Sequence, residues 1–190
     1  MKIRRASLCD LQDIARIQGE CYSDRFIESK ASFAAKLTAH PDFSFVAFRG
    51  ELAVGYVFAL PWVFGSVPDL NGLAYSIPPD ADSLYIHDIA VGQVARRAGL
   101  AERLLDSVLE AGREKGFGKA FLVAVQGASS YWQRHGFEAV QPDEALQHGL
   151  SAYGEGATCM AKPIAATPLI ERISAGKPAP AAHVEPHSPV

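Results

Sequence analysis

The sequence predicts a single α+β domain, and three observations support this fold class. The chain has 190 residues, of which 48% are hydrophobic and 21% charged, as is ordinary for a soluble globular protein with a sizeable core. Apolar side chains recur with the period of a β-hairpin between residues 43 and 64, and with the period of an α-helix between residues 97 and 115. Since strand and helix patterns continue to about residue 161, we place one domain at residues 1–165.

The N-terminal part is expected to form a short edge strand at residues 2–5 and then two helices. Ser7 is a good N-cap residue, and Asp10 follows it three positions later. Apolar residues at helical spacing then indicate a helix over about residues 8–20. A second helix, over about residues 28–39, ends before a His-Pro pair, because the residue preceding a proline avoids helical geometry.

A β-hairpin and a long loop follow these helices. Residues 43–48 alternate along the chain as a strand does, and Arg49–Glu51 form a tight turn. The return strand is predicted at Leu52–Phe64. Residues 65–81 are rich in Gly, Pro, Asn and Asp, which indicates a loop.

The second half of the domain alternates between strands and helices. An apolar strand over Leu84–Val91 carries two polar residues, His87 and Asp88. A helix over residues 97–115 has one leucine-rich face and ends at a glycine. Residues 141–156 show no regular pattern and predict a long irregular connection. The other expected elements are strands at Lys119–Val125, Phe137–Val140 and Ala157–Ala161, and a short helix at residues 128–135.

Residues 166–190 lie outside the predicted domain. Their last sixteen residues contain four prolines and four alanines, a composition that cannot form a helix or a core of its own. This tail is disordered, or it packs on its own domain or on a neighbouring molecule. A homodimer is one assembly that stays open.

Charge and composition exclude several classes of function. The formal net charge of −3 gives no general attraction to nucleic acid or to an anionic membrane, so neither is an expected partner. No stretch reaches the ~18 apolar residues of a transmembrane helix, and the N-terminus lacks the apolar region of a signal peptide. Cys9, Cys21 and Cys159 are scattered and odd in number, which indicates reduced thiols in a cytoplasmic protein. Their spacing predicts no metal site.

A basic turn between a strand and a helix is the clearest candidate for a ligand site. In the stretch IHDIAVGQVARRAGLAERLL, two adjacent arginines, Arg96 and Arg97, are followed by Gly99. The first N–H groups of a helix attract anions, and a glycine lets the backbone approach a ligand closely. The spacing matches neither the Walker A motif nor the Rossmann fingerprint. On these residues alone, an ordinary basic helix start remains an alternative.

The order of elements and two motifs resemble the GNAT superfamily of N-acetyltransferases. RRAGLA matches that family's Q/R-x-x-G-x-G/A turn, and YWQRHGF, from Tyr131 to Phe137, matches its aromatic residue before a Gly-Phe pair. The resemblance covers residues 1 to about 162. It implies a mixed, mostly antiparallel sheet flanked by helices, in which two central parallel strands splay apart, and it implies acetyl-CoA as cosubstrate.

The resemblance also assigns the contacts of the cosubstrate. The pantetheine arm would pair with the backbone of Ile89, Ala90 and Val91, and an N–H group near Ala90 would hold the oxyanion. The pyrophosphate would be bound by N–H groups of the turn, with the Arg96 side chain adding positive charge. By this resemblance, the cofactor-binding residues of the turn would be Arg96, Arg97, Ala98, Gly99, Leu100 and Ala101.

His87 is the candidate general base. The strand motif YIHDIAV most resembles the serotonin N-acetyltransferase branch, in which histidines on this strand help to deprotonate the amine; Tyr85 stands at the second of those positions. A structural role for His87 stays open. Strand alternation predicts that His87 and Asp88 point to opposite faces unless a bulge intervenes. Asp88 is expected to be structural or to bind the substrate ammonium.

The acid that protonates the leaving thiolate is less clear from the motif. The family often uses a tyrosine at the position of Trp132, whose indole is a poor acid and would instead pack against the thiol end of the cofactor. Tyr131 lies one residue earlier, about 100° around the helix. It could serve as the catalytic acid only if the helix is displaced; solvent is the other source of this proton.

These observations together predict an N-acetyltransferase that moves an acetyl group from acetyl-CoA to a primary amine of a small molecule. The alternatives are a regulatory acyl-CoA-binding module without catalysis and a protein lysine or N-terminal acetyltransferase. Aromatic residues near Tyr22, Phe26 and residues 61–64 either line an apolar acceptor pocket or pack in the core. Glu28 lies near acidic Asp24 in the first interhelical loop, where such charges are either solvated or face an amine.

Overall fold

The computed structural model describes residues 1–164 and confirms the predicted α+β fold. The predicted tail at residues 166–190 lies outside the described part. A seven-stranded sheet has the order β1-β2-β3-β4-β5-β7-β6. Every neighbouring pair is antiparallel except β4 and β5, which are parallel. The strands are β1 (Lys2–Arg5), β2 (Phe45–Arg49), β3 (Leu52–Trp62), β4 (Ser83–Val91), β5 (Lys119–Ala124), β6 (Glu138–Ala139) and β7 (Thr158–Pro163).

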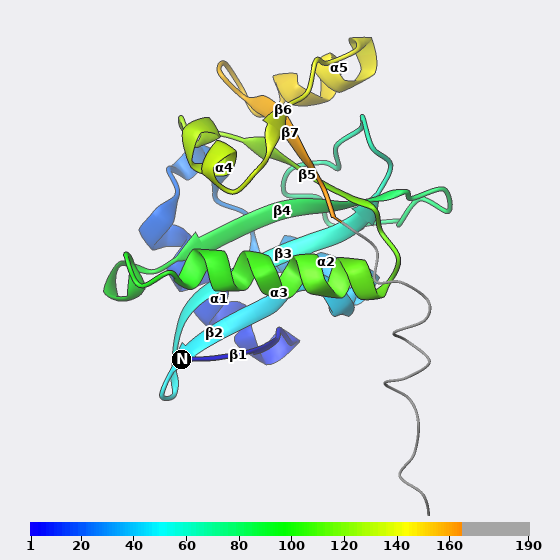
Figure 1. The fold of residues 1–190 in the computed structure, drawn as a ribbon. Helices are drawn as coiled ribbons and strands as arrows, with labels where there is room; N and C mark the ends of the chain where they lie inside the picture. Colours follow the sequence, from blue (N-terminus) through cyan, green and yellow to red (C-terminus); the bar gives the residue numbers. More distant parts are fainter. Residues whose placement is uncertain (165–190) are drawn as a thin grey trace, which may run out of the picture.

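Helices cover both faces of this sheet. Figure 1 shows α3 crossing one face and α1 and α2 on the other, with α5 at the β6–β7 side of the sheet. Leucine and valine side chains of α3 pack on the central strands, whereas α1 and α2 bury Ile14, Ile17 and Phe33 against β3. The helices are α1 (Leu11–Cys21), α2 (Lys30–Ala39), α3 (Leu100–Glu114), α4 (Ser129–Arg134) and α5 (Glu144–Ser151).

The structure corrects one predicted helix boundary and adds one helix that was not predicted. The helix expected over residues 97–115 begins at Leu100, because Arg97 and Gly99 have φ angles of 63° and 66° in the left-handed region. The segment 141–156, expected to be irregular, contains α5. The Asp143 side chain caps this helix by accepting a bond from the Leu146 N–H group at 2.9 Å.

Candidate active site

A β-bulge in the middle of β4 determines where its polar residues point. The pairing with β3 passes from Phe58 opposite Asp88 to Ala59 opposite Ile86, so His87 is an extra residue without a partner. Both His87 and Asp88 therefore point toward the face covered by α1 and α2, where they meet different partners. The expectation that these two side chains lie on opposite faces is wrong, because the bulge breaks the alternation between them.

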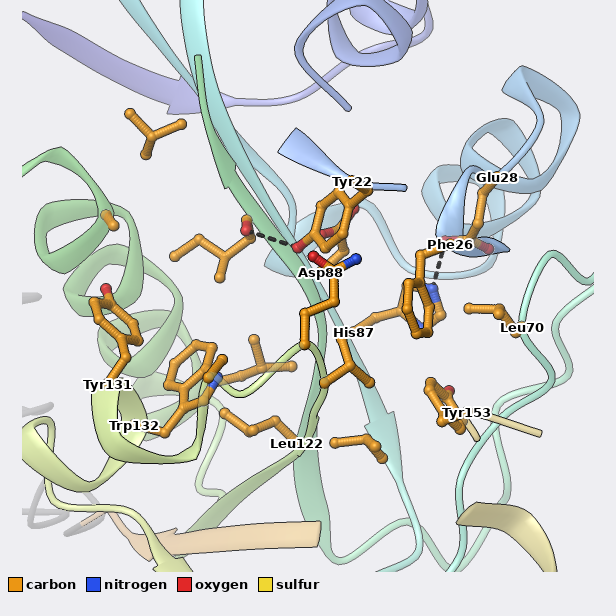
Figure 2. Close-up of a pocket in the computed structure, with 18 of the residues that line it drawn as sticks. Tyr22, Phe26, Glu28, Leu70, His87, Asp88, Leu122, Tyr131, Trp132 and Tyr153 are labelled. Atoms are coloured by element: carbon orange, nitrogen blue, oxygen red, sulfur yellow. Dashed lines mark hydrogen bonds and ion pairs between the residues drawn. The ribbon is translucent and has the colours of Figure 1, made fainter. Parts of the chain in front are cut away.

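The two parallel strands separate soon after they meet. Their pairing spans only Leu84 to Ile86 of β4, against Ala120 to Leu122 of β5. A cavity of about 370 Å³ opens where they part, and Figure 2 shows the side chains that line it. The residues labelled there are Tyr22, Phe26, Glu28, Leu70, His87, Asp88, Leu122, Tyr131, Trp132 and Tyr153.

His87 is held by a buried carboxylate. Its Nε2 atom lies 2.6 Å from Oε1 of Glu28, and the exposed fractions of the two side chains are 1% and 3%. The Nδ1 atom of His87 is also buried and makes no hydrogen bond to any residue among 1–164. With Nε2 donating to Glu28, a neutral imidazole presents a free lone pair at Nδ1.

Glu28 is fixed by two side chains of α2 and by the backbone of the loop after β3. Its Oε2 atom accepts bonds from Lys36 Nζ at 2.6 Å, from Ser32 Oγ at 2.9 Å and from the backbone N–H of Asn71 at 2.8 Å. Burial by itself raises the pKa of this carboxyl, but His87 and Lys36 outweigh burial and bring the pKa well below its ordinary value. Glu28 is therefore ionised and rigid at neutral pH.

Asp88 belongs to a separate cluster beside this one. Its Oδ1 atom accepts a bond from the Tyr22 hydroxyl at 2.6 Å, and its Oδ2 atom accepts one from the Tyr56 hydroxyl at 2.6 Å. Burial raises the pKa of Asp88, and the two tyrosine bonds only partly oppose this effect. The carboxyl groups of Glu28, from the segment before α2, and of Asp88, from β4, thus lie over the same face of the sheet with pKa shifts in opposite directions.

The basic turn forms a second hollow of about 270 Å³ next to the first, and the two share Val91, Arg96, Ala101 and Tyr131. A Cβ atom on Gly99 would meet no protein atom within 4 Å, so the space above this glycine is free for a ligand. The Arg96 guanidinium points back over the end of β4, donating to the Glu20 carbonyl at 3.1 Å. These features fit an extended, anionic cosubstrate that runs from the turn into the strand gap.

Tyr131 and Trp132 occupy different surroundings. The Trp132 ring packs edge-on against Phe137 at 5.3 Å in the core beneath α3, and another part of Trp132 lines the first cavity. Tyr131 lines both hollows, and its buried hydroxyl has no hydrogen-bond partner among residues 1–164. In Figure 2 this hydroxyl points away from His87 and Asp88. Burial raises the pKa of Tyr131.

Several side chains at this site could not be assigned from the sequence. Lys36 is fully buried. Its position beside Phe33 and Leu37 on the apolar face of α2 was the one sign in the sequence that this lysine pairs with a buried acidic group. Tyr153 follows α5; its hydroxyl lies 3.0 Å from that of Tyr85, and this contact brings it to the pocket wall. No pattern in residues 141–156 had indicated it.

The described residues contain neither a membrane-spanning helix nor a cluster of metal ligands. No helix within residues 1–164 is both long and apolar enough to cross a membrane. The same residues contain no group of three or more His, Cys, Asp or Glu side chains that could hold a metal ion.

Comparisons with known proteins agree with this fold. A model of the acetyltransferase (GNAT) family matches residues 11–137. Among solved structures, the chain is similar to the GphF GNAT-like decarboxylase in complex with isobutyryl-CoA, with 19% identity, a TM-score of 0.65, and coverage of 86% of this chain and 100% of that chain. It is also similar to the ribosomal-protein-S18-alanine N-acetyltransferase from Escherichia coli, with 16% identity, a TM-score of 0.61, and coverage of 88% and 96%.

A third similar structure is the PaiA N-acetyltransferase from Thermoplasma acidophilum in complex with coenzyme A, with 15% identity, a TM-score of 0.60, and coverage of 85% and 98%. No curated protein matches the chain. At these identities the solved structures establish the fold, while the family model covers more than half of the chain. The protein therefore belongs to the GNAT acetyltransferase family and is an acyl-CoA-dependent N-acyltransferase.

Proposed function

We propose that the protein transfers an acetyl group from acetyl-CoA to a primary amine of a small molecule with an apolar or aromatic body. One observation carries this proposal: the buried Nδ1 atom of His87 has no partner among the described residues and belongs to a side chain that lines the cavity. An alkylamine is protonated at neutral pH and attacks a thioester only as the free base. A fixed imidazole with an open lone pair is suited to take that proton.

Glu28 would keep His87 in the form that this step needs. The carboxylate accepts a hydrogen from Nε2, which places the free lone pair on Nδ1. When Nδ1 takes the proton of the ammonium, the Glu28 carboxylate stabilises the imidazolium. Lys36 and Asn71 hold that carboxylate in place, so the acid–base pair needs no reorganisation during the reaction.

The other end of the pocket suits acetyl-CoA. The N–H groups from Arg97 to Ala101 would bind the pyrophosphate, and the backbone of Ile89, Ala90 and Val91 would pair with the pantetheine arm beyond the last β4–β5 pair. The unpartnered hydroxyl of Tyr131 would bond to the cosubstrate. The amine then attacks the thioester carbonyl to form a tetrahedral intermediate, whose oxyanion an N–H group near Ala90 would hold.

The acceptor end favours an aromatic or alkyl amine over a peptide. Phe26, Leu70 and Tyr153 surround the space above His87 in Figure 2, and each comes from a different segment of the chain. The likeness of the β4 motif to the serotonin N-acetyltransferase branch is part of this proposal, because an arylalkylamine would fill such walls. Lys36 neutralises the charge of Glu28, so Glu28 attracts the substrate ammonium only weakly. The ammonium would therefore bind chiefly to the Nδ1 atom of His87.

An amine panel with acetyl-CoA, followed by thiol release, tests this function. Arylalkylamines should be acetylated faster than lysine peptides, and no turnover on any amine with acetyl-CoA bound would indicate a regulatory module. Faster turnover of peptides would favour a protein acetyltransferase.

His87→Ala should lower kcat/KM by about 100-fold or more, with the greatest loss at low pH, where the free amine is scarce. His40→Ala is the matched control, because the buried Nδ1 atom of His40 also has no partner among residues 1–164, but His40 stacks on Phe43 and does not line the pocket. An unchanged pH–rate profile in His87→Ala would remove His87 from the mechanism.

A further inference from the structure

We propose that Tyr22 is the acid that protonates the leaving CoA thiolate, and that Asp88 supplies Tyr22 with a replacement proton. The inference rests on the acetyl transfer proposed above and assigns its last proton transfer. Trp132 stands where a tyrosine acid was expected, so that position supplies no acid, and the proton comes from another side chain or from solvent. No hydrogen bond joins the Tyr22–Asp88 pair to the His87–Glu28 pair among the described residues, although the charges of His87 and Glu28 both act on the pKa of Asp88.

The Tyr22 hydroxyl has two oxygen neighbours and one hydrogen. Its Oη atom lies 2.6 Å from Oδ1 of Asp88 and 3.0 Å from the carbonyl oxygen of Ile89. With an ionised Asp88 the single hydrogen of Tyr22 has to serve both acceptors. When the Asp88 carboxyl carries a proton, the first bond reverses: Asp88 donates to Tyr22, Tyr22 donates to Ile89, and both bonds are fully made. The burial that raises the pKa of Asp88 favours this protonated form.

The Tyr22 hydroxyl lies where acetyl-CoA and the amine are expected to meet. Ile89 lies beyond Ile86, where the pairing of β4 with β5 ends, on the stretch expected to pair with the pantetheine arm. Figure 2 shows Tyr22 and Asp88 in the middle of the pocket, between the Tyr131–Trp132 side and the side of Phe26, Leu70 and Tyr153. The thioester has to lie between the cofactor end and the amine end, so Tyr22 is beside it.

Tyr22 alone would be a poor acid. Burial, followed by the neighbouring Asp88 charge, raises the pKa of Tyr22 well above its ordinary value, so an isolated tyrosinate is costly there. A protonated Asp88 removes this difficulty, because Tyr22 receives a proton as it gives one. Tyr56 completes the arrangement by bonding to the other carboxyl oxygen from within the core.

The proton transfers balance over the step. The C–S bond of the tetrahedral intermediate breaks, its electron pair moves to sulfur, and sulfur takes the proton of Tyr22. Tyr22 takes the Asp88 proton, and the Asp88 carboxylate, which lines the pocket, takes the second proton of the amine nitrogen. The products are the amide and CoA thiol, and the enzyme returns to its starting protonation state once His87 releases the first proton to solvent.

Tyr131 is less well placed for this role. It lines the hollow at the basic turn together with Arg97 and Gly99, and its hydroxyl points away from Asp88 in Figure 2. We therefore expect Tyr131→Phe to raise the KM for acetyl-CoA more than it lowers kcat.

Tyr22→Phe and Tyr56→Phe form a matched pair for the test. Each removes one 2.6 Å bond to Asp88, but only Tyr22 lines the pocket. With both substrates saturating, Tyr22→Phe should lower the kcat of thiol release by about 30-fold or more, and Tyr56→Phe by several-fold less. Equal losses in the two variants, or a large kcat loss confined to Tyr131→Phe, would overturn the proposal.

A double-mutant cycle separates a proton relay from packing. Asp88→Asn should lower kcat like Tyr22→Phe, and the double variant should be no slower than the slower single variant, because both residues serve one transfer. Additive losses contradict the relay. Thermal unfolding and acetyl-CoA affinity, measured for each variant, identify any loss due to misfolding.

The same assay keeps the two proposals apart. If no variant other than His87→Ala changes turnover, the acetyl transfer stands and the relay fails. If wild-type protein turns over no amine, the proposed function fails first.

Discussion

The Nζ atom of Lys36 lies 2.6 Å from Oε2 of Glu28, and both side chains are buried, with exposed fractions of 0% and 3%. A buried ion pair is stable only while both charges are present, because each one loses its hydration on folding. His87 is joined to this ion pair, because the other oxygen of Glu28, Oε1, forms a hydrogen bond with His87. The Glu28 carboxylate therefore contributes both to the stability of the fold and to the proposed role of His87 as a base.

Replacing Lys36 by methionine should destabilise the fold strongly. The variant leaves an uncompensated buried carboxylate, and we expect a loss of about 3–5 kcal/mol in the free energy of unfolding, measured by urea denaturation. Lys30→Met is the control: Lys30 is exposed and donates to Gln12, so its loss should stay within about 0.5 kcal/mol. Similar midpoints for the two variants would contradict the role of Lys36.

The pH dependence of stability should report on Glu28. Its pKa is lower in the folded state than in the unfolded chain, so its contribution is complete above the unfolded value and is lost as the pH falls. Glu28→Gln should be roughly 2 kcal/mol less stable than wild type at pH 6, and this gap should shrink between about pH 5 and pH 3. Urea unfolding over this range measures it. Glu51→Gln, at an exposed hairpin turn, is the control, and its stability at pH 6 should stay within about 0.5 kcal/mol of wild type.

Gly99 and Gly50 allow backbone strain to be separated from ligand binding. Their φ angles are 66° and 61°, and a Cβ atom on either would meet no protein atom within 4 Å. Gly99→Val and Gly50→Val should therefore lose similar stability, about 1–2 kcal/mol. Only Gly99→Val should weaken acetyl-CoA binding by about tenfold or more in calorimetry, because its side chain enters the hollow at the turn. Equal affinities would place the pyrophosphate elsewhere.

Much of the fold could be predicted because local patterns and tertiary packing agree. The leucine face of α3 packs in the core as its spacing indicated, and the alternation in residues 43–64 corresponds to β2 and β3. The helix α5 was missed because two leucines, Leu146 and Leu150, supply its buried face, too few to give a clear period.

The candidate site was only partly predictable. The position of His87 followed from its motif, but its partner Glu28 lies 59 residues earlier and is brought close by the packing of the loop before α2. The orientation of Asp88 depends on a bulge, which is a property of two paired strands and leaves no mark in the sequence of one. The assigned cofactor contacts, from Ile89 to Ala101, stay predictions.

Tyr153 and α5 lie beyond residue 137, where the match to the family model ends, whereas the basic turn and β4 lie within it. One wall of the proposed acceptor pocket thus comes from a segment that is not part of the shared pattern. If that wall selects the amine, substrate choice can diverge through residues 141–157 while the machinery for acyl transfer remains untouched. The specificity for the amine would then vary independently of the acyl-transfer reaction that the family shares.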